Sequence, residues 1–408
     1  MARVVLRLAV LATLALAALA GLPALPALPG PVVLPASETA VGLGAERILG
    51  GLSFPVNMAF APDGRLFFAE KDTGDIRVVV DGRLRERPMA HVEVLSSAEQ
   101  GLLGLALDPR FPAEPWLYVY YSDPATRANR LMRIRIGGGS TERQPLMDLL
   151  TTERGYHNGG DLAFGTDGTL FVAVGEAHEP QRAQDPDDLG GKILRLNPDG
   201  STPKDNPFGP DNPVFSLGHR NSFGLCVDPA NGQLWETENG PTSDDELNRI
   251  EAGGNYGWPD QLGPGGAPRF IDPVVDFPQV IVPTGCAVWR GALYFGAYEN
   301  GLLYRVRGLS TPDAEAVVVR DMGAGVTDLE VGPDGNLYVS TADAIWRLAA
   351  PGQSRAPGTP SGSSGTPVPG DDGAGGSIAR AIIVVVALAL IAITLVVRLR
   401  AGRALRRR

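Results

Sequence analysis

The segment Leu162–Glu176 reads LAFGTDGTLFVAVGE, two apolar runs separated by a tight turn at Asp167-Gly168. Short runs rich in β-branched and aromatic residues, bounded by turn residues, are typical of β-strands. Glycine accepts a positive φ without steric penalty, so Asp-Gly between two such runs predicts a β-hairpin.

The same pattern occurs six times along the chain. The other copies are MAFAPDGRLFFAE from Met58, LALDPRFPAEPWLYVYYS from Leu105, LCVDPANGQLWETENG from Leu225, CAVWRGALYFGAY from Cys286 and LEVGPDGNLYVSTAD from Leu329. Aligned on the residue after the turn, they are spaced by 51, 53, 64, 59 and 44 residues. A β repeat of about 50 residues suits a four-stranded blade, so we expect an all-β, six-bladed β-propeller over residues 45–349. A two-domain β-sandwich protein is the alternative, but it does not explain six regular hairpins.

The composition agrees with turn-rich β-structure, because 52 Gly and 35 Pro are spread between the apolar runs. We expect few helices, with one helical turn at Asp244–Ile250. Cys226 and Cys286 are the only cysteines. Their places in neighbouring repeats differ by one, so their side chains should face opposite ways. This offset disfavours a disulfide, although an exported protein permits one.

Both ends of the chain carry membrane-directed patterns. Arg3 and Arg7 precede the apolar run Leu8–Leu19, and small residues follow, so we expect a signal peptide over residues 1–20. An uncleaved N-terminal anchor is the alternative. A Pro/Ala-rich linker over residues 21–44 then leads to the propeller.

The C-terminal end predicts a tether. Residues 350–377 are dominated by Pro, Gly and Ser and suggest a disordered stalk. Residues 378–397 carry a single charge, Arg380, and at ~1.5 Å per residue a helix of this length spans the bilayer core. The arginine-rich tail at 398–408 should be cytoplasmic by the positive-inside rule. We therefore expect a single-pass protein of the cell membrane with its propeller on the extracytoplasmic side.

The net charge of −10 understates the acidity of the propeller, because nine of the 36 basic residues lie in the two membrane-directed ends. Such an acidic domain does not favour binding to nucleic acid or to anionic lipid.

Polar residues precede the inner strands of three successive repeats: Gln100 in the second, His157 in the third, and Arg220-Asn221 in the fourth. Equivalent positions in a propeller meet at the same mouth of the central channel, so these side chains should face one another. A neutral imidazole can take a hydroxyl proton, and a guanidinium can stabilise the oxyanion that develops. Glu176 ends the hairpin that His157 opens and is the candidate to fix the tautomer of the histidine. The alternative is that His157 only caps a turn.

Oxygen donors follow in the fourth repeat: the Gly240 and Pro241 carbonyls, Glu246, and the region of Tyr256. Such donors suit Ca²⁺. The run Asp185–Asp188 also looks calcium-like, but it lacks the terminal Glu of an EF-hand loop, and we interpret it as a solvated loop. The sequence has no dinucleotide-binding strand–loop–helix unit and no zinc spacing. We interpret His91 and His178 as surface residues, and Trp258 as a wall of the mouth or as core.

From Leu49 to Leu348 the chain resembles the soluble glucose/sorbosone dehydrogenase family, whose members include pyrroloquinoline quinone (PQQ)-dependent aldose sugar dehydrogenases. The motifs that carry the resemblance are EQGLLGLALDP, HNGGDLAFGTDG, GGKILRLNPDG, GHRNSFGL and DELNRIEAGGNYGWP, which begin at Glu99, His157, Gly190, Gly218 and Asp245. The resemblance implies a six-bladed propeller.

It also implies roles for the candidate residues. His157 is the implied base for the anomeric hydroxyl proton of a sugar, with Glu176 as its supporting acid. Gln100, Arg220 and Asn221 are implied to contact cofactor or substrate. Gly240 and Pro241 match carbonyl ligands of a catalytic Ca²⁺, and Glu246 with Tyr256 match a further calcium site.

Two segments depart from the family pattern. A cofactor-binding Lys of the fifth unit is replaced by Tyr298-Glu299-Asn300, and an Arg-x-Arg before the last hairpin by Gly325-Val326-Thr327. PQQ carries three carboxylates, and the lost cations would each remove a charge-assisted bond of about 1.5–3 kcal/mol.

The sequence therefore predicts a membrane-anchored sugar dehydrogenase that uses PQQ and Ca²⁺ and passes electrons to an external acceptor. A cell-surface binding propeller without redox turnover is the second hypothesis, motivated by the missing cations. A Ca²⁺-dependent lactonase on the same scaffold is the third.

Overall fold

The structure is a computed structural model that describes residues 43–137, 142–151, 154–309, 311 and 313–349. They all belong to one compact unit, Met1–Gln353. The predicted signal peptide, nearly all of the linker, the stalk, the membrane helix and the basic tail lie outside the described residues. Among the residues described, none forms an apolar helix of membrane-spanning length.

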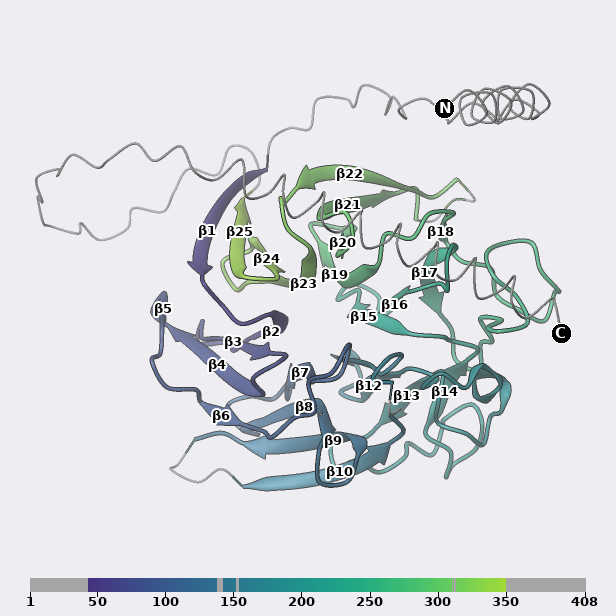
Figure 1. Cartoon of the computed structure of the whole chain (residues 1–408), viewed down its shortest axis with the longest axis horizontal. Helices are drawn as coiled ribbons and strands as arrows, with labels where there is room; N and C mark the ends of the chain where they lie inside the picture. The colour runs from purple at the N-terminus through teal and green to yellow at the C-terminus, as the bar shows by residue number, and fades with distance from the viewer. Residues whose placement is uncertain (1–42, 138–141, 152–153, 310, 312, 350–408) are drawn as a thin grey trace, which may run out of the picture. The chain divides into compact units, whose positions relative to one another are not determined.

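The predicted all-β propeller is confirmed, because the strands form six antiparallel sheets in chain order (Figure 1). Each predicted hairpin supplies the two inner strands of one sheet. We number these blades one to six by their innermost strands: β2 (Pro55–Phe60), β7 (Leu102–Leu107), β11 (Gly159–Phe164), β15 (Ser222–Val227), β19 (Pro283–Trp289) and β23 (Val326–Val331). The second strands are β3 (Leu66–Glu70), β8 (Trp116–Asp123), β12 (Leu170–Val174), β16 (Leu234–Glu238), β20 (Ala292–Ala297) and β24 (Leu337–Thr341).

The outer strands complete each blade. They are β4 (Asp75–Val80), β5 (Arg83–Leu84) and β6 (Ala90–His91) in blade one; β9 (Ala128–Arg135) and β10 (Arg143–Leu149) in blade two; β13 (Lys192–Leu196) and β14 (Val214–Leu217) in blade three; β17 (Asp245–Ile250) and β18 (Val275–Phe277) in blade four; β21 (Leu302–Arg307) and β22 (Glu315–Asp321) in blade five; and β25 (Ala344–Ala349) with β1 (Gly44–Gly50) in blade six. A short 3₁₀ helix, η1, covers Pro180–Gln184.

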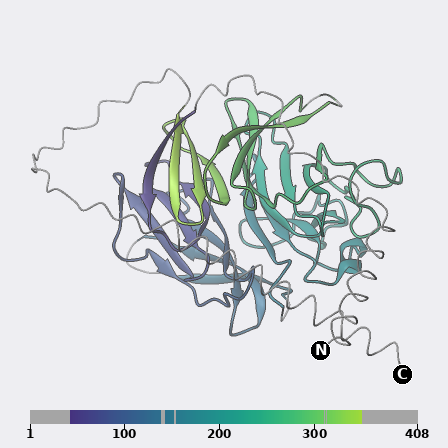
Figure 2. The same cartoon turned by 45° about the horizontal axis from the view of Figure 1, so that its top comes forward.

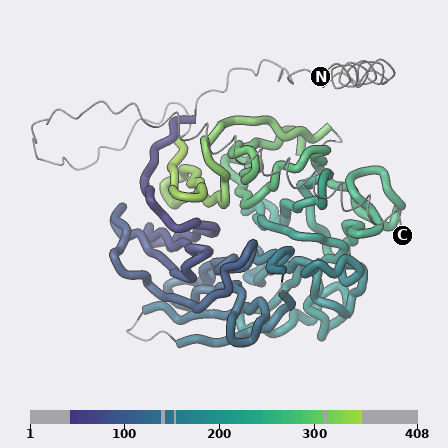
Figure 3. Tube along the Cα trace, in the orientation of Figure 1, coloured from purple at the N-terminus to yellow at the C-terminus, as the bar shows by residue number. Residues whose placement is uncertain are grey.

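The ring closes through a strand from the other end of the domain. The sixth repeat is short, and its outermost strand is β1, which pairs antiparallel with β25. Each innermost strand contacts the next one, and β23 contacts β2. Figures 2 and 3 show the first described segment, in purple, beside the last, in yellow-green. Closure leaves no inner sheet edge free to pair with another chain.

Two expectations about this region are wrong. The residues expected to form a helical turn, Asp244–Ile250, are instead mostly strand β17, which pairs with β16 on one side and β18 on the other. Five of its six residues are buried, so the sheet ladder and its packing override any local helical preference.

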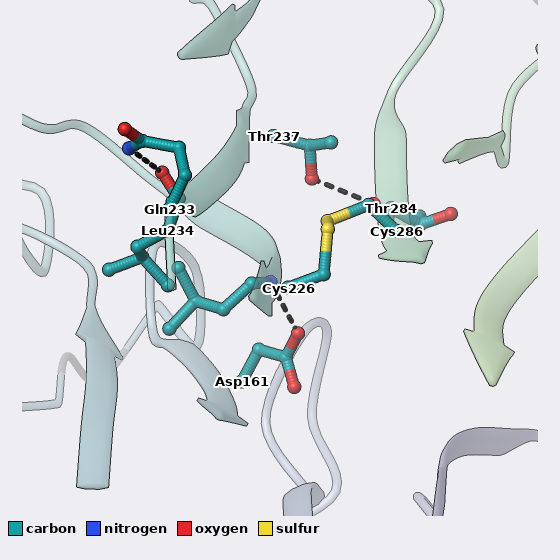
Figure 4. The surroundings of a disulfide bond; sticks show 8 residues. Asp161, Cys226, Gln233, Leu234, Thr237, Thr284 and Cys286 are labelled. Carbon is teal, nitrogen blue, oxygen red and sulfur yellow. Dashed lines mark hydrogen bonds between the residues drawn. A yellow bond between two sulfur atoms is a disulfide. The ribbon is translucent and has the colours of Figure 1, made fainter. Parts of the chain in front are cut away.

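The second wrong expectation concerns the cysteines, because Cys226 on β15 and Cys286 on β19 form a disulfide (Figure 4). Cys226 and its neighbour Trp235 pack in a cluster with Phe295 of blade five, whereas Leu234, on the other face, packs against Phe171 of blade three. Opposite faces of neighbouring blades therefore meet. Because successive residues of a strand point to opposite faces of its sheet, two cysteines whose positions in the repeat differ by one residue point toward each other across these facing blades.

We expect loss of this link to lower stability, because it restrains two inner strands whose cysteines are 60 residues apart in sequence. Replacing both cysteines by serine should lower the free energy of unfolding by about 2–4 kcal/mol. Urea unfolding of the wild type and the double variant, each with and without a reductant, measures this. Equal stability of the oxidised wild type and the double variant would contradict the disulfide.

Acidic side chains on the innermost strands tie the blades together near the channel axis. Asp161 accepts hydrogen bonds from Asn57 Nδ2 (3.0 Å) and from the Leu225 amide (2.6 Å). Asp328 accepts one from the Met58 amide at 2.8 Å. Burial raises the pKa of Asp161 to about 7, and burial with the charge of Asp161 raises the pKa of Asp328 well above its usual value. These carboxyls therefore keep their protons to a higher pH in the folded protein than in the unfolded chain.

Because their pKa values are higher in the folded than in the unfolded protein, the stability that these two carboxyls contribute should be fully present at acidic pH and should be lost as the pH rises from about 4 to about 7. Asp328→Asn keeps an acceptor for the Met58 amide but removes one charge. We expect it to raise the free energy of unfolding at pH 8 by about 1–3 kcal/mol and to change it little at pH 4. Urea titrations at both values test this, with the exposed Asp313→Asn as control. The same pH slope in both variants would refute the assignment.

Candidate active site

The loops at one mouth of the channel are held by a backbone hydrogen bond that recurs in every blade. A residue near the end of the second strand donates its N–H to the carbonyl of a residue one or two places before the innermost strand. The six pairs are Lys71 to Phe54, Ser122 to Gly101, Ala177 to His157, Asn239 to Asn221, Tyr298 to Val282 and Ala342 to Gly325. Gln100, His157, Arg220 and Asn221, which were predicted to face one mouth, all lie in these loops, and so do Glu176 and Gly240.

His157 is fixed at both ring nitrogens. Its Nδ1 lies 2.8 Å from Glu176 Oε1, and its Nε2 lies 2.8 Å from Arg220 Nη2. A carboxylate can only accept and a guanidinium can only donate. The imidazole is therefore neutral, with its proton on Nδ1 and a lone pair on Nε2. Glu176 thus contacts the histidine that it was predicted to support.

Arg220 is held in turn by the loop after β16. Its Nη1 donates to the carbonyls of Asn239 (2.8 Å) and Gly240 (3.0 Å), and its guanidinium lies over the ring of Trp258 at 5.4 Å. Trp258 is thus a wall of the mouth, which is one of the two roles predicted for it. Arg220 Nε is buried and has no partner among the described residues.

Glu99 is a part of the site that the sequence patterns did not single out. Its Oε2 accepts hydrogen bonds from the His157 amide (2.7 Å) and from Asn221 Nδ2 (3.1 Å). Asn221 Oδ1 in turn accepts from the Gly159 amide at 3.1 Å. His157 has a positive φ of 58°, a costly conformation for a residue with a Cβ, and these bonds help to hold it. Glu99 precedes Gln100 in a quoted motif, which was the available signal.

His178 was interpreted as a surface residue, and this is wrong. Its ring stacks on that of His157, with centroids 4.0 Å apart and planes at 25°, and Tyr156 meets it edge-on at 5.8 Å. Burial lowers the pKa of His178, so it is neutral near pH 7. His91 is exposed as expected and pairs with Asp75 and Glu93.

Gln100 contacts the network behind the histidine. It is buried and donates to Thr151 Oγ1 at 3.1 Å, and Thr151 donates to Asn158 Oδ1 at 2.8 Å. Asn158 follows His157 in the chain. The structure therefore brings Gln100 to the same mouth, where it is linked through Thr151 to Asn158, the residue next to His157 in the chain.

The expected calcium ligands gather on the blade-four side of the mouth. Gly240, Glu246 and Tyr256 line one small cavity together with Arg220 and Glu238, and Pro241 follows Gly240 in the same loop. Burial and the charge of Glu238 raise the pKa of Glu246 to about 8. The Tyr256 hydroxyl donates to the Arg249 carbonyl and accepts from the Glu251 amide, so its hydrogen-bonding capacity is used within the loop.

Beneath this cavity lies a buried cluster of His219, Glu236 and Glu238, whose ligand atoms are within 4.8 Å of one another. Although burial alone would lower it, the charges of the two glutamates raise the pKa of His219 to about 10. An imidazolium then balances the carboxylates and donates to Glu238 at 3.0 Å. In the described residues the three side chains thus form a buried ion-pair network.

The run Asp185–Asp188 forms a turn. The Asp187 amide donates to Asp185 Oδ1, and Asp188 binds the Gly190 amide and Arg182. Its carboxylates are thus used for local bonds and a surface ion pair.

Comparison with known proteins places the chain in a family. A family model described as Glucose / Sorbosone dehydrogenase matches residues 52–348. An aldose sugar dehydrogenase of Escherichia coli is 29% identical over 332 residues, which are 73% of this chain and 89% of that protein. The Hedgehog-interacting protein of mouse is 27% identical over a shorter part, 40% of this chain and 28% of its own length.

Solved structures agree. An oxidoreductase of Thermus thermophilus described as a glucose dehydrogenase is 38% identical, with a TM-score of 0.71 over 76% of this chain and 100% of its own. The PQQ-bound aldose sugar dehydrogenase of Streptomyces coelicolor is 30% identical, with a TM-score of 0.67 over 75% of this chain and 97% of its own. With its propeller and the His157–Arg220 site in the matched region, the chain belongs to the glucose/sorbosone dehydrogenase family.

Proposed function

We propose that this protein oxidises the anomeric hydroxyl of an aldose, with PQQ as hydride acceptor and Ca²⁺ as an aid. The observation that carries the proposal is the neutral His157, whose Nε2 lone pair faces the mouth beside Arg220 while Glu176 holds its Nδ1 proton. A base within hydrogen-bond reach of a hydroxyl, next to a fixed cation, is what such an oxidation requires of the protein.

The residues at the mouth fit the reactive part of the quinone. Arg220 Nε and Trp258 Nε1 are buried polar atoms without partners in the described residues, on side chains that line the cavity beside His157. Buried donors of this kind are seldom left unsatisfied, which favours a polar ligand here. Arg220, Asn221 and Gln100 would hold PQQ, which when bound supplies the hydride acceptor. The Gly240 and Pro241 carbonyls would hold a catalytic Ca²⁺, and Glu246 with Tyr256 a further one.

The base must exchange one partner for another during binding. Arg220 Nη2 donates to His157 Nε2, so the substrate hydroxyl has to replace it as donor to that lone pair. Arg220 keeps its bond to the Asn239 carbonyl, which holds its charge close to the oxygen that loses the proton. Glu176 then stabilises the imidazolium that forms.

The cellular location of the reaction is also part of the proposal. The patterns at residues 1–20 and 378–397 support an extracytoplasmic propeller tethered to the cell membrane by one helix. The substrate would be a small sugar, and the electrons would leave to an external acceptor.

Replacing the base tests the proposal directly. With saturating PQQ and Ca²⁺, the wild type should reduce a redox dye in the presence of aldoses, and His157→Ala should lower kcat by about 10²–10⁴. The exposed His91→Ala is the matched control and should leave the rate unchanged. A wild type that is inactive across a panel of aldoses would refute the assignment.

The orienting role of Glu176 gives a second test. Glutamine at this position can donate to Nδ1 and so favour the tautomer that lacks a lone pair on Nε2, so we expect Glu176→Gln to lower kcat by about 10–100-fold. Glu179→Gln, which changes an exposed carboxylate in the same loop, is the control. Equal rates for the two variants would show that Glu176 does not orient the base.

A second candidate function is a cell-surface binding propeller without turnover. It is supported by the similarity to the Hedgehog-interacting protein and by the replacement of the family's cofactor-binding cations at Tyr298, Gly325 and Thr327. Thr327 serves the fold instead, donating to the Pro55 carbonyl at 2.6 Å. Stoichiometric binding of PQQ in calorimetry would argue against this candidate.

A further inference from the structure

The side of the mouth that faces His157 and Arg220 across the channel is aromatic. Phe54 precedes β2 in blade one, and Tyr298 follows β20 in blade five. Their ring centroids are 5.7 Å apart at an angle of 45°. Tyr298 is 37% exposed, an unusual degree for a large ring beside a buried core. Blades five and one flank blade six, which lies opposite blade three in a ring of six, so this pair lies across the channel from His157.

Gly325 in blade six makes the seat for the tyrosine ring. A Cβ at this position would lie 2.6 Å from Tyr298 Cδ2 and 2.8 Å from Cε2, closer than real Cβ contacts allow. The Gly325 carbonyl is fixed by the Ala342 amide, so the backbone cannot simply move away. The Tyr298 ring can therefore occupy its position only because residue 325 is glycine: the ring fills the space that a side chain at 325 would need.

Phe54 is held in a strained conformation. Its φ of 56° is in the left-handed region, which bulky residues rarely adopt. Its carbonyl accepts the Lys71 amide, and the Lys71 ammonium lies 5.3 Å over its ring. Strain of this kind persists where the surroundings impose it, and it is concentrated at ligand-binding positions.

The ammonium of Lys71, the cation over the Phe54 ring, already has partners. Lys71 Nζ contacts Asp72 at 2.5 Å and donates to the Ala98 and Gln100 carbonyls at 3.3 and 3.2 Å. The Thr327 hydroxyl is bonded to the Pro55 carbonyl. This part of the mouth is therefore suited to the apolar face of an uncharged ring and not to a carboxylate.

We propose that Phe54 and Tyr298 form a platform on which a neutral pyranose ring stacks, with Gly325 as the residue that keeps Tyr298 in place. The C–H face of a sugar packs on an aromatic ring while its hydroxyls stay hydrated at the rim, as in sites that combine aromatic walls with few polar groups. The platform rests on the proposed function and deepens it, because it assigns the residues that select a sugar ring at the mouth where His157 acts.

Sugar contact can be measured without catalysis. The probe is methyl β-D-glucopyranoside, which has no free anomeric hydroxyl, added to the purified full-length chain without PQQ. Saturation-transfer difference NMR, with irradiation of aromatic protons, should show transfer to the ring C–H protons of the probe. Tyr298→Phe should preserve the effect, and Tyr298→Ala should reduce it by roughly fivefold, as loss of an aromatic contact predicts.

Gly325→Val tests the seat without deleting the ring. It should reduce the transfer as much as Tyr298→Ala does, whereas Gly44→Val, at a position with nothing near its Cβ, should not. Thermal unfolding of each variant shows whether it is folded, and Tyr298→Leu replaces Tyr298→Ala if the latter is not.

The outcomes separate the platform from the dehydrogenase. No transfer in the wild type, or equal transfer in wild type, Tyr298→Ala and Gly325→Val, overturns the platform. So does a Tyr298→Ala variant that retains sugar contact but loses PQQ binding. A wild type without dehydrogenase activity that still shows Tyr298-dependent transfer leaves the platform standing and removes the proposed reaction.

Discussion

The pairing of β1 with β25 is the interaction on which the site depends. It supplies the fourth strand of blade six from the other end of the domain and so closes the ring. Only a closed ring brings loops from blades two, three and four to one mouth in a fixed order. His157, Arg220 and Glu99 are far apart in sequence and touch one another only because of this geometry.

Within the mouth, each charged group is restrained by another. Glu99 holds the backbone of His157, Glu176 holds its ring, and Arg220 binds the opposite nitrogen. Arg220 is itself bound by the carbonyls after β16 and rests on Trp258. Such mutual restraint fixes the tautomer of His157, which is the kind of preorganisation that the proposed reaction would require.

Much of this could be predicted from the sequence, because a hairpin repeated at a regular spacing determines both the fold and the equivalence of loop positions. That equivalence placed Gln100, His157 and Arg220 at one mouth. Glu99 and His178 were missed because their contacts cross between loops and have no periodic signal. The helical turn at Asp244–Ile250 failed because sheet pairing decided its conformation. The disulfide was missed because the one-residue difference between the positions of Cys226 and Cys286 was taken to turn their side chains apart. Neighbouring blades meet through opposite faces, so the same difference turns them toward each other.

Closure of the ring also makes the two ends of the domain neighbours, since Gly44 lies directly opposite Ala349 on paired strands. A short peptide could join them, and the chain could then be opened at a surface loop between any two blades. The propeller is thus suited to circular permutation, since its order of blades has no physical beginning.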